Sequence, residues 1–208
     1  MNENAQKVKT NRKPRIRSAA KEAAYLALGV AILTVCAWIT IPFGTIPVTL
    51  QTFAVALIGA LLGAVRGVTV VLVYFIMGLI GIPVFSNFNA GVVALLGPTG
   101  GYLIGFVFSV AIVGLFSMIP VKNKIAKTAT VYGGAVLGMM ICYFFGTLWF
   151  VTVYNRGGAE TVSIAAALML CVVPYLLPDA VKLFFGALLG VRLKGVVKIE
   201  KTHNKKTR

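Results

Sequence analysis

Apolar runs recur along this chain, and they decide which solvent it folds in. A helix needs about 20 mostly apolar residues to cross a bilayer, and 59% of the 208 residues are hydrophobic while only 12% are charged. That balance is far more apolar than a soluble domain shows. Six runs can be distinguished, at residues 23–41, 48–64, 68–80, 101–119, 129–153 and 164–190. The sequence therefore predicts an all-α integral membrane protein with six transmembrane helices in a single domain.

Helix-breaking residues mark where these helices are expected to end or bend. The second run is predicted to stop at Arg66 and Gly67. The stretch 84–98 is uncharged and consists of small, aromatic and amide residues, so we expect a loop there. The last run contains Pro174 and Pro178, and a bend or break is predicted at both because proline disrupts helix interiors.

The positive charges gather at one set of helix ends. Of the 20 Lys and Arg residues, 18 fall in the N-terminal tail, at Arg66, in the loop at 122–127 or in the C-terminal tail, whereas Arg156 lies on the opposite side. Because cytoplasmic loops collect Lys and Arg, both termini are expected in the cytoplasm. The predicted segments are a basic cytoplasmic tail at 1–21, a transmembrane substrate-binding domain at 22–191 and a second basic cytoplasmic tail at 192–208.

The net charge of +15 is explained by these flanking residues. They hold the orientation of the helices and meet anionic lipid headgroups, and no folded basic domain remains that could bind nucleic acid. The expected partner is therefore the lipid bilayer of a cell membrane, and nucleic acid is excluded.

Asp179 and Lys182 are the only acid and base inside any apolar run. A charge at the bilayer centre costs roughly 2.5 to 3.5 kcal/mol, so something must stabilise both side chains. Residues three apart on a helix share a face, and these two can pair or hold one polar guest between them. Two hypotheses stay open: a ligand site, or a structural ion pair that ties helices together.

Three amide side chains are further candidates. The predicted orientation puts the loop at 81–98 and the start of the sixth helix on the outer side, so a guest would be reached from outside. Asn87 and Asn89 offer amide donors and acceptors there, or simply complete turns. Gln51, near the outer end of the second helix, is a weaker candidate whose alternative role is a structural hydrogen bond.

Several chemistries have no residues to carry them. The only histidine, His203, lies in the basic tail, and Cys36, Cys142 and Cys171 fall in separate apolar runs without paired spacing. Asp179 has no second carboxylate in the membrane for acid–base work or for a metal cluster. The sequence contains no phosphate-binding loop. We therefore predict no enzyme, cofactor or metal, and uphill transport would need a partner or an ion gradient.

Four motifs, in order along the chain, carry a resemblance to a known family. They are IPVTLQT at 46–52, GIPVF at 81–85, LGPTGGY at 96–102 and PDAVK at 178–182. In this register the chain is similar, over roughly residues 20–190, to the BioY family, the biotin-binding S components of energy-coupling factor (ECF) transporters. The resemblance implies a six-helix bundle that captures biotin from outside, alone or docked to a transmembrane coupling protein and two cytoplasmic ATPases.

The resemblance also implies a polar site at Asn89, Asp179 and Lys182. Biotin's ureido ring has two N–H donors and one carbonyl acceptor, which an Asp, a Lys and an Asn could satisfy. The sequence 86–91 reads SNFNAG where the family has a glycine run, so Asn87 competes with Asn89 for the role. Some relatives carry Arg after the tyrosine of the third motif, where this chain has Leu103.

Small residues on the first helix suggest a docking face. Their spacings of three and four put them in one stripe, which would let another helix approach closely. The stripe consists of Ala20, Ala24, Ala27 and Ala31. S components are similar in having an alanine motif here that docks on the coupling protein; the alternative is packing within the bundle. Glu22, at the cytoplasmic rim, is expected to be solvated.

The resemblance favours a vitamin transporter subunit. One alternative within transport is an S component for another vitamin, such as riboflavin or thiamine. From a different class, the chain could be a structural membrane protein in which Asp179 and Lys182 only fix helix packing.

Overall fold

The computed structural model describes residues 12–42, 46–156 and 161–195. Apart from turns and two short paired strands, these described residues are helical, so the all-α prediction is confirmed. In chain order the elements are α2 (Arg12–Trp38), β1 (Thr40–Ile41), β2 (Val48–Thr49), α3 (Gln51–Leu62), α4 (Ala64–Leu79), η1 (Ser86–Phe88), α5 (Gly91–Leu96), α6 (Gly100–Phe116), α7 (Lys124–Arg156), α8 (Ile164–Cys171), η2 (Val173–Tyr175) and α9 (Leu176–Lys194). Most of the two predicted tails, with His203, lies outside the described residues.

The helices differ in their ability to cross a bilayer. Among the described residues, the segments Ala19–Trp38, Lys124–Arg156 and Ile164–Lys194 are long and apolar enough to span. The helices α3, α4 and α6 are apolar but have only 12, 16 and 17 residues. Two long helices extend beyond the predicted limits, because Lys, Arg and Ala are good helix formers and continue a helix past its apolar part.

Two predicted features of the helices differ from the structure, namely the end of the second run and one of the two bends in the last run. The helix α3 ends at Gly63, whose φ of 82° suits glycine, and Arg66 lies in the first turn of α4 instead of in a connecting turn. The last run does break at Pro174, within η2. The predicted bend at Pro178 is wrong, because this proline lies in the first turn of α9, where its missing N–H breaks no helical bond.

The stretch predicted as a loop contains two short helical pieces, η1 and α5. Asn87 and Phe88 have φ angles of 56° and 58°, which lie in the left-handed region. Tertiary contacts hold this stretch: the indole N–H of Trp38 donates to the Pro83 carbonyl at 2.9 Å, and that of Trp149 to the Gly97 carbonyl at 3.0 Å. The stretch is thereby fastened to α2 at one end and to α7 at the other.

Glycines bring α9 directly against α3, whose residues are nearly all buried. A Cβ atom at Gly186 would lie 2.7 Å from the Phe53 carbonyl oxygen, and one at Gly190 would collide with Ala60. With no side chains between them, the two backbones approach closely. The two helices run in parallel, so their N-terminal ends meet.

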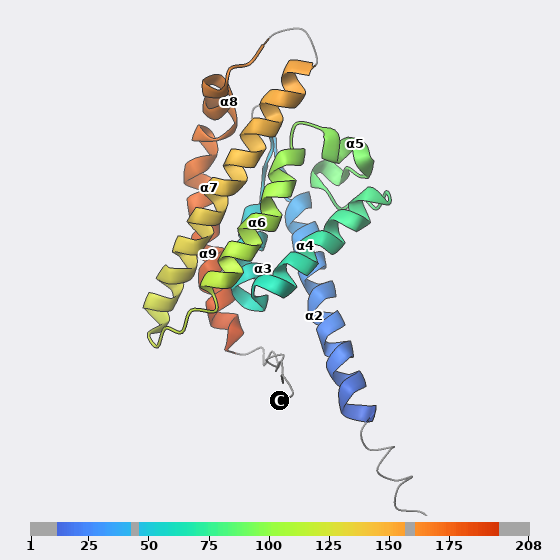
Figure 1. Ribbon diagram of the computed structural model, residues 1–208, viewed down its shortest axis with the longest axis vertical. Helices are drawn as coiled ribbons and strands as arrows, with labels where there is room; N and C mark the ends of the chain where they lie inside the picture. The colour runs from blue at the N-terminus through green and yellow to red at the C-terminus, as the bar shows by residue number, and fades with distance from the viewer. Residues whose placement is uncertain (1–11, 43–45, 157–160, 196–208) are drawn as a thin grey trace, which may run out of the picture.

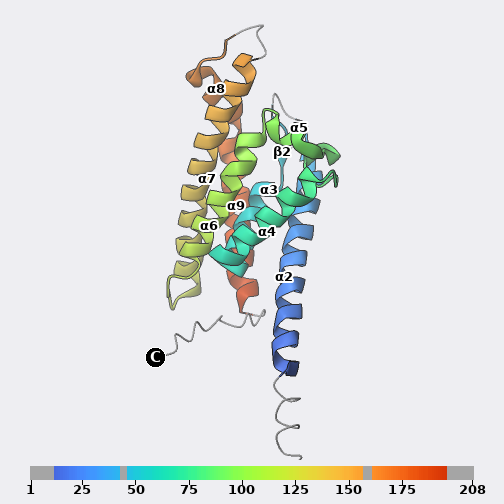
Figure 2. The ribbon, with the colours of Figure 1, turned by 45° about the vertical axis from the view of Figure 1, so that its right-hand side comes forward.

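The segments that connect the helices lie at two opposite ends of the molecule (Figure 1). The beginning of α2, the turn between α3 and α4, the connection from α6 to α7 and the end of α9 share one end, while α5 and α8 lie toward the other. Figure 2 shows the same arrangement from a second direction, with the N-terminal half of α2 projecting beyond the other helices.

Candidate functional site

A cavity of about 400 Å³ lies where the N-terminal ends of α3 and α9 meet. Its walls come from α3 and the segment before it, from the η1 and α5 region, and from α6, α7, η2 and α9. This volume falls within the range of small-molecule sites, which are mostly apolar with a few converging polar groups. The converging polar groups here are on α3, α7 and α9.

Asp179 and Lys182 form an ion pair at the cavity wall, with 2.5 Å between the Lys182 Nζ and the Asp179 Oδ1. Asp179 is only 5% exposed. The break at Pro174 makes Asp179 a first-turn residue of α9, where the positive end of the helix dipole favours a carboxylate. Discontinuous membrane helices bind polar groups at such ends.

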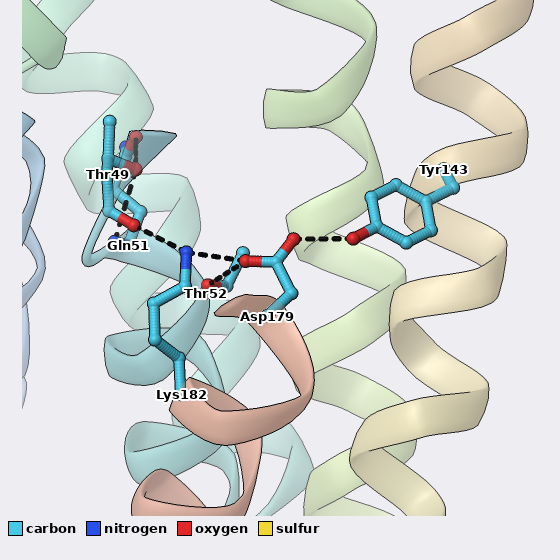
Figure 3. Close-up of polar contacts among 6 residues, drawn as sticks. All are labelled: Thr49, Gln51, Thr52, Tyr143, Asp179 and Lys182. Atoms are coloured by element: carbon cyan, nitrogen blue, oxygen red, sulfur yellow. Dashed lines mark hydrogen bonds and ion pairs between the residues drawn. The ribbon is translucent and has the colours of Figure 1, made fainter. Parts of the chain in front are cut away.

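Two further donors hold the Asp179 carboxylate, as Figure 3 shows. The Thr52 hydroxyl, from the first turn of α3, donates to Oδ1 at 3.0 Å. The Tyr143 hydroxyl, from α7, donates to Oδ2 at 2.5 Å. Since each carboxylate oxygen can accept about two hydrogen bonds, Oδ1 is saturated by Thr52 and Lys182. Oδ2 has capacity for one more donor.

Lys182 has two acceptors among the described residues. Its Nζ donates to the Thr49 carbonyl oxygen at 2.8 Å in addition to its contact with Asp179. An ammonium group carries three donors, so one remains for another acceptor. The ion pair therefore offers one acceptor position, on Asp179 Oδ2, and one donor position, on Lys182 Nζ, to a polar guest.

The structure separates the two candidate asparagines. Both side chains are exposed, but only Asn89 is among the residues that line the cavity. The backbone explains the difference, because Asn87 is in a left-handed conformation and Asn89 in an extended one. Asn89 can therefore add an amide donor and acceptor to the site.

Gln51 lines the cavity and is also part of a buried hydrogen-bond chain. Its Oε1 accepts from the Thr49 hydroxyl at 3.0 Å, and its Nε2 donates to the Tyr74 hydroxyl at 3.0 Å. Tyr74 in turn donates to the Val84 carbonyl. This chain anchors the start of α3 to α4 and to the entry of the η1 region, which is the structural role weighed for Gln51.

Apolar side chains form the rest of the wall. They include Phe85, Val93, Leu103, Phe106 and Met139. Leu103 is buried, so the position that carries Arg in some relatives contributes apolar surface in this chain. A guest here would need an apolar body and a compact polar group.

The four alanines of the predicted docking stripe are all exposed on α2. Packing within the bundle would have buried them, so the chain itself does not use this face. The expectation that Glu22 is merely solvated is wrong. Its carboxylate accepts two hydrogen bonds from the Arg66 guanidinium of α4, at 2.6 and 3.0 Å.

Sequence reasoning missed Thr49, Thr52 and Tyr143. Both threonines lie within the motif at 46–52, beside Gln51, and that motif was the available signal. Tyr143 had no such signal, because it precedes Phe144 and Phe145 in a continuous apolar run. Only the packing of α7 shows which of these aromatic residues faces the cavity.

Fold and site together define a helical membrane protein with a cavity for a small molecule that has both polar and apolar parts. The chain belongs to the BioY family, whose model matches residues 5–199.

Similar proteins span most of the chain. It is 36% identical to the probable biotin transporter BioY of Pyrococcus horikoshii, over 85% of this chain and 98% of that one. It is also 36% identical to the biotin transporter BioY of Thermotoga maritima, over 79% of this chain and 90% of the relative. The crystal structure of the S-component for biotin from an ECF-type ABC transporter has a TM-score of 0.73, covers 86% of this chain and 93% of its own, and is 24% identical. That likeness supports the fold.

Proposed function

We propose that the chain is the biotin-binding membrane subunit, or S component, of an ECF-type vitamin uptake transporter. The observation that carries the proposal is the paired charge of Asp179 and Lys182 at the wall of a largely apolar cavity, in a chain of the BioY family. Relatives of this family are named as biotin transporters. The protein binds and delivers its guest and does no chemistry on it.

The proposed binding mode uses the open positions of the polar network. One ureido N–H of biotin donates to Asp179 Oδ2, and the third Lys182 donor binds the ureido carbonyl or the carboxylate. Asn89 serves a remaining donor or acceptor. The apolar wall covers the thiophane ring and the valeryl chain. An analogue without the ureido hydrogens would leave the second acceptor position of Asp179 Oδ2 unfilled and bind more weakly.

The proposed topology has six membrane-crossing helical segments, with both termini in the cytoplasm of the cell and the cavity toward the outside. The shared end of the molecule in Figure 1 supports it, because the connections predicted to be cytoplasmic gather there. Residues 22–191 form the single transmembrane domain, with a basic cytoplasmic tail on each side. The shorter α3 is accommodated because other helices cover it, so it need not span hydrocarbon.

The proposed partners are a transmembrane coupling protein and two cytoplasmic ATPases. The sequence has no phosphate-binding loop of its own, so ATP would be hydrolysed by those subunits. The docking face is the exposed stripe of Ala20, Ala24, Ala27 and Ala31, which allows close approach of another helix. All four side chains are exposed among the described residues, so the face is open to another helix.

Isothermal titration of the purified subunit in detergent tests the ligand. Biotin is expected to bind at roughly one molecule per chain, with desthiobiotin and riboflavin as comparators. Riboflavin binding instead of biotin would point to an S component for another vitamin. No binding of any of the three to folded protein would overturn the proposal.

Co-purification with the coupling protein and its ATPases tests the docking face. The variant Ala24→Leu/Ala27→Leu is expected to lose the partners and to keep biotin binding. The matched control is Ala126→Leu/Ala129→Leu, which places the same bulk at the same spacing on exposed positions of α7. Equal loss of the partners from both variants would contradict the assignment.

A further inference from the structure

Two lysines from distant parts of the chain converge on the end of α6. The Nζ of Lys127, in the first turn of α7, donates to the carbonyl oxygens of Ser117 at 2.8 Å and Ile119 at 2.5 Å. The Nζ of Lys194, the last residue of α9, donates to the same Ser117 carbonyl at 3.2 Å and to the Ser117 hydroxyl at 3.1 Å. Because both ammonium groups bind one oxygen, they lie within about 6 Å of each other.

The local charge is not balanced by the described residues. The C-terminal end of a helix supplies only about half a negative charge, against two ammonium groups. The carboxylates in the described part of the chain are Glu22 and Asp179, and both are paired elsewhere, with Arg66 and Lys182 respectively. Capping α6 therefore accounts for part of the arrangement and leaves more than one unit of positive charge.

The two lysines also keep hydrogen-bonding capacity. Each ammonium group has three donors and uses two of them on the end of α6. One donor from each side chain is left, and the two come from different helices. A phosphate group, with several acceptor oxygens, can accept from both at once.

The surroundings indicate which kind of anion fits. Large apolar side chains beside the lysines are exposed, including Met118, Ile119, Ile125 and Leu193. A free phosphate ion gains nothing from this apolar surface, whereas a phospholipid places its phosphate on the lysines and its acyl chains along these residues. The site lies at the end of the molecule proposed to face the cytoplasm, where anionic lipids concentrate.

We propose that Lys127 and Lys194 form a binding site for the phosphate of an anionic phospholipid. The bound lipid bridges α7 and α9 at the end of α6, and α9 is the helix that carries Asp179. This site is separate from the biotin cavity and does not depend on the identity of the vitamin.

Thermal unfolding of the full chain in a neutral detergent, followed with a thiol-reactive dye, tests the proposal. The dye suits this protein because Cys36, Cys142 and Cys171 are free and buried. Titration with phosphatidylglycerol is expected to raise the unfolding midpoint, while phosphatidylcholine and inorganic phosphate leave it unchanged. Lys127→Gln/Lys194→Gln is expected to weaken the apparent phosphatidylglycerol affinity about thirtyfold.

The matched control is Lys122→Gln/Lys124→Gln, which removes the same charge from exposed positions of the neighbouring loop and helix start. It is expected to keep the response to phosphatidylglycerol, as is Lys127→Arg/Lys194→Arg. If the glutamine double variant at 127 and 194 is not monodisperse, Lys194→Gln alone replaces it, with an expected loss of about fivefold.

Three results would overturn the lipid site. Equal losses in the variant and its control would indicate general charge attraction. An equal rise with inorganic phosphate would indicate a free-anion site. No response of the unmodified protein to phosphatidylglycerol would show that the lysines do not bind this lipid. It would favour an acidic segment of a partner protein as their ligand.

Discussion

The molecule has two ion pairs among its described residues, and they are built in opposite ways. Glu22 and Arg66 come from different helices, α2 and α4, and join them in a two-hydrogen-bond contact at one end of the molecule. Asp179 and Lys182 are three residues apart on α9, buried at a cavity wall. The first pair connects two helices directly, whereas the second contacts other elements only through hydrogen bonds with Thr52 on α3, Thr49 on β2 and Tyr143 on α7.

This difference separates packing from ligand binding. An ion pair that serves only to tie helices together has the form of Glu22 and Arg66, with one partner on each helix. A pair within one helix turn adds little to packing by itself, yet it bears the cost of two buried charges. That cost is offset by polar groups at a cavity, which supports the ligand-site hypothesis over the structural one.

Asp179→Asn is expected to have the largest effect on biotin binding, a loss of about a hundredfold or more. The substitution removes the negative charge and leaves Lys182 without its counter-ion, while the side-chain volume is almost unchanged. Titration calorimetry measures the loss, and size-exclusion chromatography checks that the protein is monodisperse.

The charge-neutral variant Asp179→Asn/Lys182→Gln is the control for the first prediction. It removes both charges, so an unpaired buried lysine cannot explain the result. The ligand-site hypothesis predicts a folded protein that does not bind biotin. Unchanged biotin binding in this double variant would contradict it.

Tyr143→Phe is expected to weaken biotin binding by about tenfold to thirtyfold. The hydroxyl is the donor that the structure gives to Asp179 Oδ2. The expected loss corresponds to about 1.4 to 2 kcal/mol, near the lower end of the range for hydrogen bonds to charged groups. Tyr132→Phe, also on α7, is the matched control and should bind like the unmodified protein. Equal titration curves for the Tyr143 variant and the control would remove Tyr143 from the site.

Thr52→Val is expected to weaken biotin binding by about threefold to tenfold. The effect should be smaller than that of Tyr143→Phe, because Oδ1 keeps Lys182 as a partner when the Thr52 hydroxyl is lost. Thr130→Val on α7, where the hydroxyl bonds only a carbonyl of its own helix, serves for comparison. A larger loss than in the tyrosine variant would reverse the proposed ranking of the two donors.

Glu22→Gln is expected to have the smallest effect. It should leave biotin affinity within about twofold and lower stability by about 1 kcal/mol or less, as for other partly exposed ion pairs. Thermal unfolding and biotin titration of the same sample measure both quantities. A tenfold loss of biotin affinity would show that the two ion pairs are energetically coupled.

The sequence predicted the helical layout because the apolar runs are long and the bilayer leaves few options. The six runs correspond to α2, α3, α4, α6 and α7 and to the broken segment from Ile164 to Lys194. The short strands and α5 could not be predicted, because they depend on contacts between distant segments. The bonds from Trp38 and Trp149 that hold the η1 and α5 region are examples.

Charge made part of the site predictable. Asp179 and Lys182 stand out in an apolar run, and both line the cavity, as do Asn89 and Gln51. The partners of Asp179 are ordinary helix residues until folding brings α3 and α7 beside α9. Thr52 and Tyr143 lie 127 and 36 residues from Asp179, and no local pattern links them.

The Asp179 network has a kinetic consequence. Its three donors are already in place around the carboxylate. Few side chains therefore have to be ordered when a guest binds, which lowers the entropic cost of binding. Affinity gained in this way appears mainly as slow dissociation, which implies a long residence time. Release of the guest from the cavity would then limit delivery. A shift of α9 along α3 that moves Asp179 away from the guest would speed that release. The close glycine contact between α3 and α9 leaves little room for such a shift. The rate of uptake would therefore depend on the interaction that separates these two helices.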